Sequence, residues 1–189
     1  MANTKVVTNK VRFSYAYLFE PQPSFSGGDP KYSVTLLIPK SDTVTLNAIK
    51  AAQQAARDNF CARNGANALP VQFNHTLHDG DGLRDSGEEY GPECKGHYVI
   101  TVNTKNKPAI VDSSGNVILD ASEVYSGCYG RASINFYGYS VNGKKGVSAG
   151  LLGIQKLHDG EPFGSVGSAN DFNDGFKDPD SSANDDFLS

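Results

Sequence analysis

The sequence predicts a mainly β protein, a small barrel with one α-helix, followed by a disordered acidic C-terminal tail. A long alternating run over residues 3–20 and a hairpin over residues 125–157 are its two most evident strand regions. The composition agrees, because 20 Gly, 9 Tyr and 10 Phe occur without any Trp. At 189 residues the chain is long enough to bury the core of a single domain.

The first predicted strand, over residues 3–20, cannot be straight. A period of two places five large residues on one of its faces, namely Val11, Phe13, Tyr15, Tyr17 and Phe19. So many large side chains cannot all lie in the core unless the strand bends or bulges. We therefore expect a long, curled strand that serves both halves of a small barrel.

A second strand and one helix follow. Residues 31–39 alternate, with four hydrophobic or aromatic residues in phase, namely Tyr32, Val34, Leu36 and Ile38. Ser41 or Asp42 can cap a helix whose core-facing residues are Leu46, Ile49, Gln53, Ala56 and Phe60. Asn64-Gly65 ends this helix, because glycine tolerates the left-handed cap. We expect the helix to pack over the sheet or to close one end of it.

Residues 66–96 form an irregular polar segment, and a long loop in a compact domain is often functional. One group of residues in and after it has a spacing close to that of zinc ligands, namely His75, His78, Cys94 and His97. An acidic cluster begins like a calcium loop but holds Arg84 and Tyr90 where that loop needs glycine and glutamate. This cluster consists of Asp79, Asp81, Asp85, Glu88 and Glu89. Both groups are weak candidates, and we expect no metal and no cofactor.

Catalytic and targeting motifs are missing from the sequence. It contains no G-x-x-x-x-G-K-[ST], and it offers no credible pair of nucleophile and base, so we expect no enzyme. No signal peptide and no 18-residue apolar stretch occur, which predicts a cytoplasmic protein that does not enter a membrane. Three widely spaced cysteines, Cys61, Cys94 and Cys128, predict reduced thiols.

The closing hairpin follows three predicted strands over residues 97–104, 109–112 and 117–119. Its turn is Asn142-Gly143, a strong hairpin signal because both positions of a type I′ turn need positive φ. One face of the first arm is typical of a core, with Ala132, Ile134 and Phe136. The other face and the tip carry the polar set Arg131, Ser133, Asn135, Tyr137, Tyr139, Lys144 and Lys145.

This polar face suits a flexible polyanion with flat bases, because cations contact phosphates and rings stack on bases. A solvated sheet face with ordinary tyrosines is the alternative interpretation, since tyrosine is common in strands.

The formal net charge of −4 hides an asymmetry. Residues 1–158 have a net charge of +3, whereas residues 159–189 have a net charge of −7. The second segment is rich in Gly, Ser, Asn and Asp and has no apolar period, so we expect a domain over residues 1–158 and a disordered tail over residues 159–189. Aromatic and acidic residues of this tail indicate a peptide that docks on partners, namely Phe172, Phe176, Asp185, Asp186 and Phe187. A tail that only increases solubility is the alternative.

Six segments, in the same order along nearly the whole chain, resemble a family of bacteriophage single-stranded DNA-binding proteins. They are K-V-R-F-S-Y at 10–15, K-Y-S-V-T-L-L-I-P-K at 31–40, D-G-D at 79–81, G-H-Y at 96–98, Y-S-G-C-Y-G-R at 125–131 and I-Q-K-L-x-D-G-E-P at 154–162. The resemblance implies an OB-like five-stranded barrel with an acidic C-terminal tail. It also implies binding and protection of single-stranded DNA during phage replication and recombination, in the cytoplasm of the infected bacterial host.

With this resemblance, we expect DNA to lie across the outward sheet face. The residues expected to bind it are Arg12, Tyr15, Tyr17, Lys31, Lys105, Lys107, Arg131, Tyr137, Tyr139, Lys144 and Lys145. Phosphate contacts and stacking do not read base edges, so binding should be independent of sequence and sensitive to salt. The tail should occupy the groove when DNA is absent and, once released, bind phage or host DNA polymerase, helicase or recombination proteins. A virion structural or decoration protein and a metal-dependent enzyme acting on nucleic acid are the alternative functions.

Overall fold

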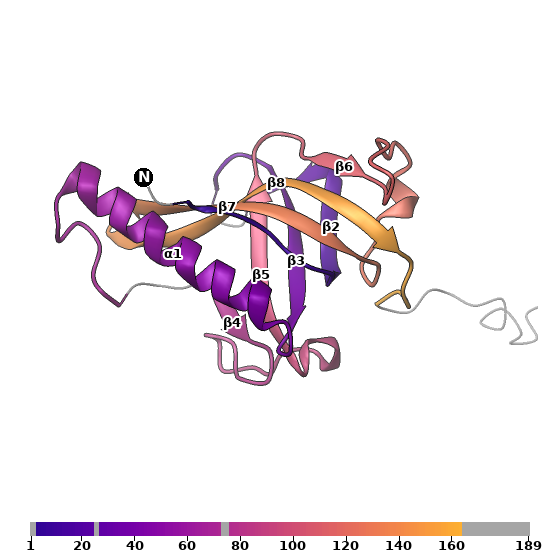
Figure 1. Ribbon diagram of the computed structural model, residues 1–189, viewed down its shortest axis with the longest axis horizontal. Coiled ribbons are helices and arrows are strands. Elements are labelled where there is room, and N and C mark those ends of the chain that lie inside the picture. Colours follow the sequence, from indigo (N-terminus) through magenta and orange to yellow (C-terminus); the bar gives the residue numbers. More distant parts are fainter. Residues whose placement is uncertain (1–2, 25–26, 73–75, 164–189) are drawn as a thin grey trace, which may run out of the picture.

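The structure is a computed structural model that describes residues 3–24, 27–72 and 76–163 (Figure 1). Its strands are β1 (Lys5–Val7), β2 (Val11–Gln22), β3 (Lys31–Pro39), β4 (Leu77–Asp79), β5 (His97–Thr104), β6 (Ala109–Val111), β7 (Tyr129–Val141) and β8 (Lys144–His158). Its helices are α1 (Thr43–Asn64) and the short 3₁₀ turns η1 (Pro92–Cys94) and η2 (Ala121–Glu123). The predicted mainly β fold with one α-helix is confirmed.

The strands form one sheet that closes on itself. Its order is β1-β7-β2-β3-β5-β8-β6, with β4 added to β5 and a further pairing between β7 and β8. The pairings therefore close a ring of five strands, β7, β2, β3, β5 and β8. The link between β5 and β8 is the thinnest, a single parallel pair of Asn103 and Gly150. All five ring strands lie in regions that the sequence predicts to be strands.

Helix α1 begins and ends where the capping residues predict. The Asp42 carboxylate accepts a hydrogen bond from the backbone N–H of Thr45 at 3.1 Å, and Gly65 ends the helix at a φ of 111°. The helix buries Leu46, Ile49 and other small or apolar residues, and it lies across β1 and β7 (Figure 1). Leu46 and Ile49 belong to the same hydrophobic core as the buried residues of the ring strands.

The first predicted strand is interrupted, so the prediction of one continuous strand over residues 3–20 is wrong. β1 and β2 both pair with β7, but residues 8–10 between them form neither pairing. Here the Thr8 side chain accepts from the backbone N–H of Ala132 at 3.0 Å, and this contact replaces a ladder bond. The break is a bulge, because four steps along this strand, from Val7 to Val11, lie opposite only three steps along β7, from Ser133 to Gly130.

The closing hairpin is confirmed in detail. Asn142 and Gly143 have φ values of 50° and 78°, as a type I′ turn requires. On the first arm, Ala132, Ile134 and Phe136 are each at most 1% exposed. The predicted strand over residues 117–119 is wrong, because the structure has only an isolated bridge between Val111 and Val117. The sequence around it forms a tight turn in which the Asp112 carboxylate holds the backbone N–H groups of Ser114 and Asn116.

The described chain continues to Phe163, so the first five residues of the predicted tail lie against the domain. The Tyr125 hydroxyl donates to the Asp159 carboxylate at 3.0 Å, and the Lys156 ammonium lies 2.7 Å from the same carboxylate. Residues 164–189 lie outside the described residues. In the part of the chain that the structure describes, no helix combines the length and apolar character needed to cross a membrane.

Candidate nucleic-acid interface

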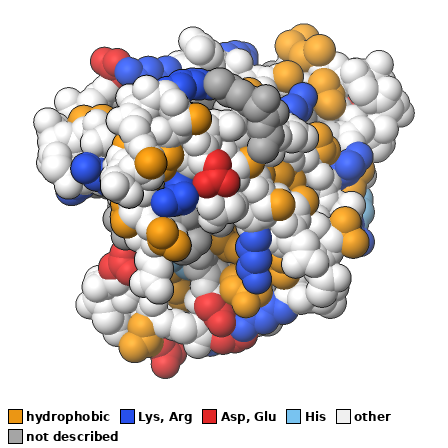
Figure 2. All heavy atoms as spheres, turned by 60° about the vertical axis from the view of Figure 1, so that its left-hand side comes forward, with side chains coloured by type: hydrophobic (Ala, Val, Ile, Leu, Met, Phe, Trp, Pro, Cys, Tyr) orange, Lys and Arg blue, Asp and Glu red, His pale blue; other side chains and the backbone are white. Residues whose placement is uncertain are grey.

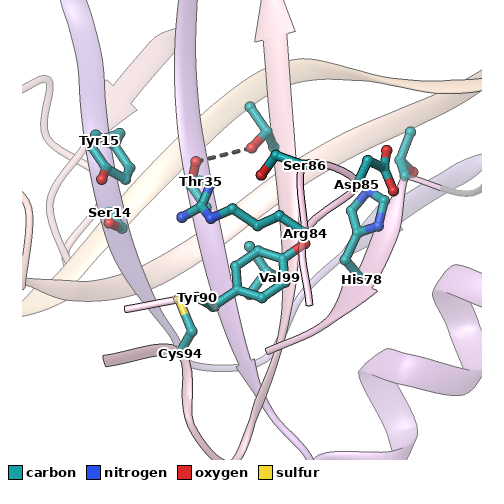
Figure 3. Close-up of a pocket in the computed structure, with 12 residues that line it drawn as sticks. Ser14, Tyr15, Thr35, His78, Arg84, Asp85, Ser86, Tyr90, Cys94 and Val99 are labelled. Carbon is teal, nitrogen blue, oxygen red and sulfur yellow. Dashed lines mark hydrogen bonds between the residues drawn. The ribbon is translucent and has the colours of Figure 1, made fainter. Parts of the chain in front are cut away.

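A pocket of about 580 Å³, which we call the main pocket, lies on the outer face of β2, β3 and β5 (Figure 3). Its residues come from these strands, from β4 and the residue before it, and from the segment between β4 and β5, which folds over the strands. They are Ser14, Tyr15, Thr35, Thr76, His78, Arg84, Asp85, Ser86, Tyr90, Cys94, Val99 and Thr101.

The pocket floor is a row of hydroxyl groups between buried residues. Ser14 pairs with Thr35 and Thr35 pairs with Thr101 across three adjacent strands. The Thr35 and Thr101 hydroxyl oxygens are 3.0 Å apart (Figure 3). Successive side chains of a strand point to opposite faces of the sheet. Because the neighbours of these residues point inward to the core, the hydroxyl groups point outward. The hydroxyl groups of the floor can therefore both donate and accept hydrogen bonds, so they do not select one particular ligand group.

Arg84 and Tyr90 form the wall opposite the floor. The Arg84 guanidinium lies over the Tyr90 ring, 4.7 Å from its centroid, and it extends toward Thr35 (Figure 3). Burial raises the pKa of the Tyr90 hydroxyl, so this ring stays neutral at physiological pH. A cation stacked on a ring, beside a hydroxyl floor, suits a phosphate next to a base.

Tyr15 forms the exposed edge of the pocket because β2 bulges there. The pairing of β2 with β3 shifts between Ser14 and Tyr17, and Tyr15 has a positive φ of 46°. This bulge turns the Tyr15 ring outward, where it is 56% exposed, although Phe13 on the same predicted face is fully buried. The expected bulge in this strand is thus confirmed.

A second hollow of about 360 Å³ lies beyond the main pocket along β5. Lys31, Lys105 and Tyr137 line it together with Asn103. Thr101 of the main pocket and Asn103 of this hollow stand two residues apart on the same face of β5. We call the surface that the two hollows form together the outer strip. It presents three exposed or half-buried tyrosines and three cations, and Lys105 forms an exposed ion pair with Asp29 at 3.0 Å.

The segment between β4 and η1 is held in place by Lys40. Its ammonium lies 2.7 Å from the Asp79 carboxylate and 2.6 Å from the Asp81 carboxylate. Hydrogen bonds from Lys40 lower the pKa of both carboxyls below 3.8. Because the pKa values of both carboxyls are lower in the folded protein, the stability that these carboxylates contribute is present above pH 3.8. It is lost as the pH falls through the pKa values of the folded protein. The start of the acidic cluster therefore neutralises a lysine.

The structure brings four of the predicted DNA-binding residues onto the outer strip, namely Tyr15, Lys31, Lys105 and Tyr137. Two predicted cations instead bind backbone carbonyls of this chain. The Arg12 guanidinium donates to Gly127 O at 3.0 Å and to Glu161 O at 2.7 Å. The Arg131 guanidinium donates to Thr8 O at 2.8 Å and lies on another face, beside Val7 and Val111.

The remaining predicted residues are dispersed. Lys107 lies near the Phe19 ring and beside the 117–119 segment, while Tyr139, Lys144 and Lys145 lie at the hairpin tip. Tyr17 is 42% exposed and pairs with Ser33 of β3. On the face shown in Figure 2, Lys and Arg side chains are separated by hydrophobic and polar ones. A single continuous basic patch is thus not a feature of that face.

Within residues 3–24, 27–72 and 76–163, no group of three or more His, Cys, Asp or Glu side chains could hold a metal ion. Of the weak zinc candidates, His75 lies outside the described residues, His78 lines the main pocket and Cys94 is buried. The His97 ring Nδ1 lies 2.8 Å from the carbonyl of Lys95.

Sequence reasoning missed the residues that complete the outer strip, namely Thr35, Arg84, Tyr90, Thr101 and Asn103. A signal for the two threonines exists, since each stands between two hydrophobic residues of a predicted strand and should therefore face outward. Arg84 and Tyr90 lie in the irregular segment, whose path over β5 depends on contacts far apart in the sequence. In the sequence these two residues argued only against a calcium loop, and their type, a cation and an aromatic residue in a long loop, is the one local signal for DNA binding that they carry.

Residues 4–188 match the model of a protein family described as the single-stranded DNA-binding protein of Enterobacter phage Enc34. The chain belongs to this family. A relative, putative protein p50 of Acyrthosiphon pisum secondary endosymbiont phage 1, is 34% identical over an alignment of 180 residues, and the match covers 90% of this chain and 93% of p50.

Solved structures agree with this assignment. The single-stranded DNA-binding protein from bacteriophage Enc34, in complex with single-stranded DNA, has a TM-score of 0.74 at 28% identity. That match covers 85% of this chain and 90% of the Enc34 chain. The gp2.5 single-stranded DNA-binding protein of bacteriophage T7 has a TM-score of 0.59 at 15% identity, over 94% of this chain and 97% of gp2.5, and it therefore supports the fold alone.

Proposed function

We propose that this protein binds and protects single-stranded DNA during phage DNA replication and recombination, in the cytoplasm of the infected bacterial host. The observation that carries the proposal is the outer strip, in which Tyr15, Arg84 and Tyr90 at one end and Lys105 and Tyr137 at the other face the same side of the sheet. Membership of a family named for single-stranded DNA binding supports it. The virion and metal-enzyme alternatives have no comparable support.

Binding would use rings for bases and cations for phosphates. Tyr15 and Tyr137 are 56% and 43% exposed, so each can stack on a base without repacking the core. Arg84, Lys31 and Lys105 can contact phosphates. Hydroxyl groups on the floor can bond any base edge, so affinity should depend little on sequence. The family is a class of binding proteins, and we expect no catalytic activity.

The site is tested by fluorescence anisotropy with a labelled oligonucleotide of roughly 20 nucleotides, longer than the ~4–16 that an OB fold covers. We expect preference for the single strand over its duplex. Arg84→Ala and Lys105→Ala should each weaken binding and reduce the slope of log affinity against log salt by about 0.7, as expected for one lost phosphate contact.

Lys50→Ala is the matched control, because Lys50 is an exposed lysine on α1 that lines neither hollow of the strip. Equal losses for Lys50→Ala and Lys105→Ala would show that only net charge matters, which would contradict the proposed site.

We further propose that residues 164–189 reduce DNA binding through their charge and dock on replication or recombination proteins. These residues hold six Asp and Lys177, a net charge of −5, and they follow Phe163, which lies beside the main pocket. A tethered acidic segment is present at high effective concentration and competes with DNA for the cations of the strip.

A chain ending at Phe163 should bind single-stranded DNA more tightly than the full chain at low salt. The difference should shrink above about 0.1 M salt, where the screening length falls to ~10 Å. The control is a full-length chain with the six tail Asp residues changed to Asn, which should match the truncated chain. Identical affinity of the truncated, neutralised and unmodified chains would refute the tail mechanism.

A further inference from the structure

The Phe163 ring fills a notch at one end of the main pocket. Leu37, Cys94 and Val99 form the buried floor of this notch, and Tyr90 packs beside Phe163 on it. Phe163 itself is only half-buried, and its backbone N–H donates to Ser126 O at 3.0 Å. A flat ring therefore already occupies a flat apolar site on the outer face of the sheet.

Arg12 forms one side of the notch. Its guanidinium carbon lies 4.2 Å from the Phe163 ring centroid and 5.2 Å from the Tyr129 ring centroid. Its Nε donates to Gly127 O at 3.0 Å, a bond that does not involve the tail, so the guanidinium stays in place if the tail moves. Its Nη2 donates to Glu161 O at 2.7 Å, a bond that ends if the tail moves.

The notch is continuous with the main pocket. Cys94 and Val99 of its floor and the neighbouring Tyr90 also line the pocket, and Figure 3 shows Cys94 and Tyr90 together at one end of it, beneath Arg84. A strand lying in the main pocket therefore reaches the notch by passing Tyr90.

We propose that the notch is a further binding site for one nucleobase of single-stranded DNA, and that Phe163 fills it when DNA is absent. The base would stack on the Arg12 guanidinium in place of the phenyl ring. The freed Nη2 would then donate to a phosphate oxygen of the same strand. This inference rests on the proposed function, and it gives Arg12 a role in DNA binding after the tail has moved.

Only residues 161–163 need to move for this exchange. Asp159 is held by Tyr125 and Lys156, and Gly160 N–H donates to the Tyr125 hydroxyl at 3.2 Å. None of these contacts involves residues 161–163, so they can persist when Phe163 leaves. The exposed Glu161 carboxylate has the same sign of charge as an arriving phosphate, so movement of this segment also reduces repulsion of the DNA.

Phe163→Trp tests the exchange directly in the full chain, because the protein has no tryptophan of its own. Saturating single-stranded DNA should increase acrylamide quenching of the introduced indole, while anisotropy of the labelled DNA in the same sample reports binding. Leu119→Trp, at an 85% exposed position outside the outer strip, is the control and should change little. DNA binding with unchanged quenching of the Phe163→Trp variant would overturn this inference alone, whereas absence of DNA binding would overturn the proposed function as well.

A second pair of full-length variants separates stacking from release of the tail. Phe163→Ala should tighten binding by about 5-fold or more, the low end of the effect of one stacked base. Adding Arg12→Lys should abolish this gain, because lysine keeps the charge but lacks the planar face. A gain that survives Arg12→Lys would mean that Phe163→Ala acts only by loosening the tail, and it would contradict a base site in the notch.

Discussion

Replacing Tyr15 with glycine is expected to weaken single-stranded DNA binding by roughly 5- to 150-fold, the effect of losing about 1–3 kcal/mol of base stacking. Tyr15 is the more exposed of the two tyrosines in the main pocket, and β2 turns it outward at a bulge. Anisotropy binding to a labelled single strand measures the loss.

The same substitution should change the free energy of unfolding by less than about 1 kcal/mol. Tyr15 has a φ of 46°, and a left-handed backbone costs a residue with a Cβ roughly 1–2 kcal/mol, which glycine avoids. Glycine also makes the unfolded chain more flexible, which offsets about 0.4–1 kcal/mol of that gain. Tyr15→Phe is the control and should retain both binding and stability. Binding that remains at the unmodified level in Tyr15→Gly would contradict a stacking role.

Phe13→Ala should have the opposite profile, with a loss of about 3–5 kcal/mol in the free energy of unfolding. Phe13 is fully buried and packs on Gly130, where an added Cβ would lie 2.7 Å from the Phe13 ring. A domain of this kind has a total stability of about 5–15 kcal/mol, so the variant loses a large fraction of it. Denaturant unfolding measures the change.

Phe13→Leu controls for this core position and should lose clearly less, because it leaves a smaller cavity. Folded Phe13→Ala protein, prepared at low temperature, should still bind DNA, because the Phe13 ring does not reach the outer strip. If Phe13→Ala were no less stable than the unmodified chain, the placement of Phe13 in the core would be wrong.

Phe13 and Tyr15 also show how far the sequence predicts the structure. The period of two places both on one face, and it correctly predicts that the strand must bulge. It does not predict the position of the bulge, so it cannot say which of the two rings is exposed. The turn at Asn142-Gly143 and the caps of α1 were predictable because each depends on a few neighbouring residues.

The candidate site was less predictable because its contacts are far apart in the sequence. Arg12 and Arg131 have the residue type of a phosphate ligand, yet each binds a carbonyl more than 100 residues away in the chain. Arg84 and Tyr90 reach the site only because their segment folds over β5, held by Lys40 and the two carboxylates beside it. Residue type indicated the kind of ligand correctly, whereas the residues that meet on one surface follow from the tertiary fold.

The central claim, that single-stranded DNA follows the outer strip, is tested most directly by photo-cross-linking. The full chain would be irradiated with an oligonucleotide carrying 4-thiothymidine at each position in turn, and cross-linked peptides would be identified by mass spectrometry. We expect cross-links at Tyr15, Tyr90 and Tyr137. Cross-links confined to the hairpin tip around Lys144 and Lys145, with none on the strip, would contradict the account.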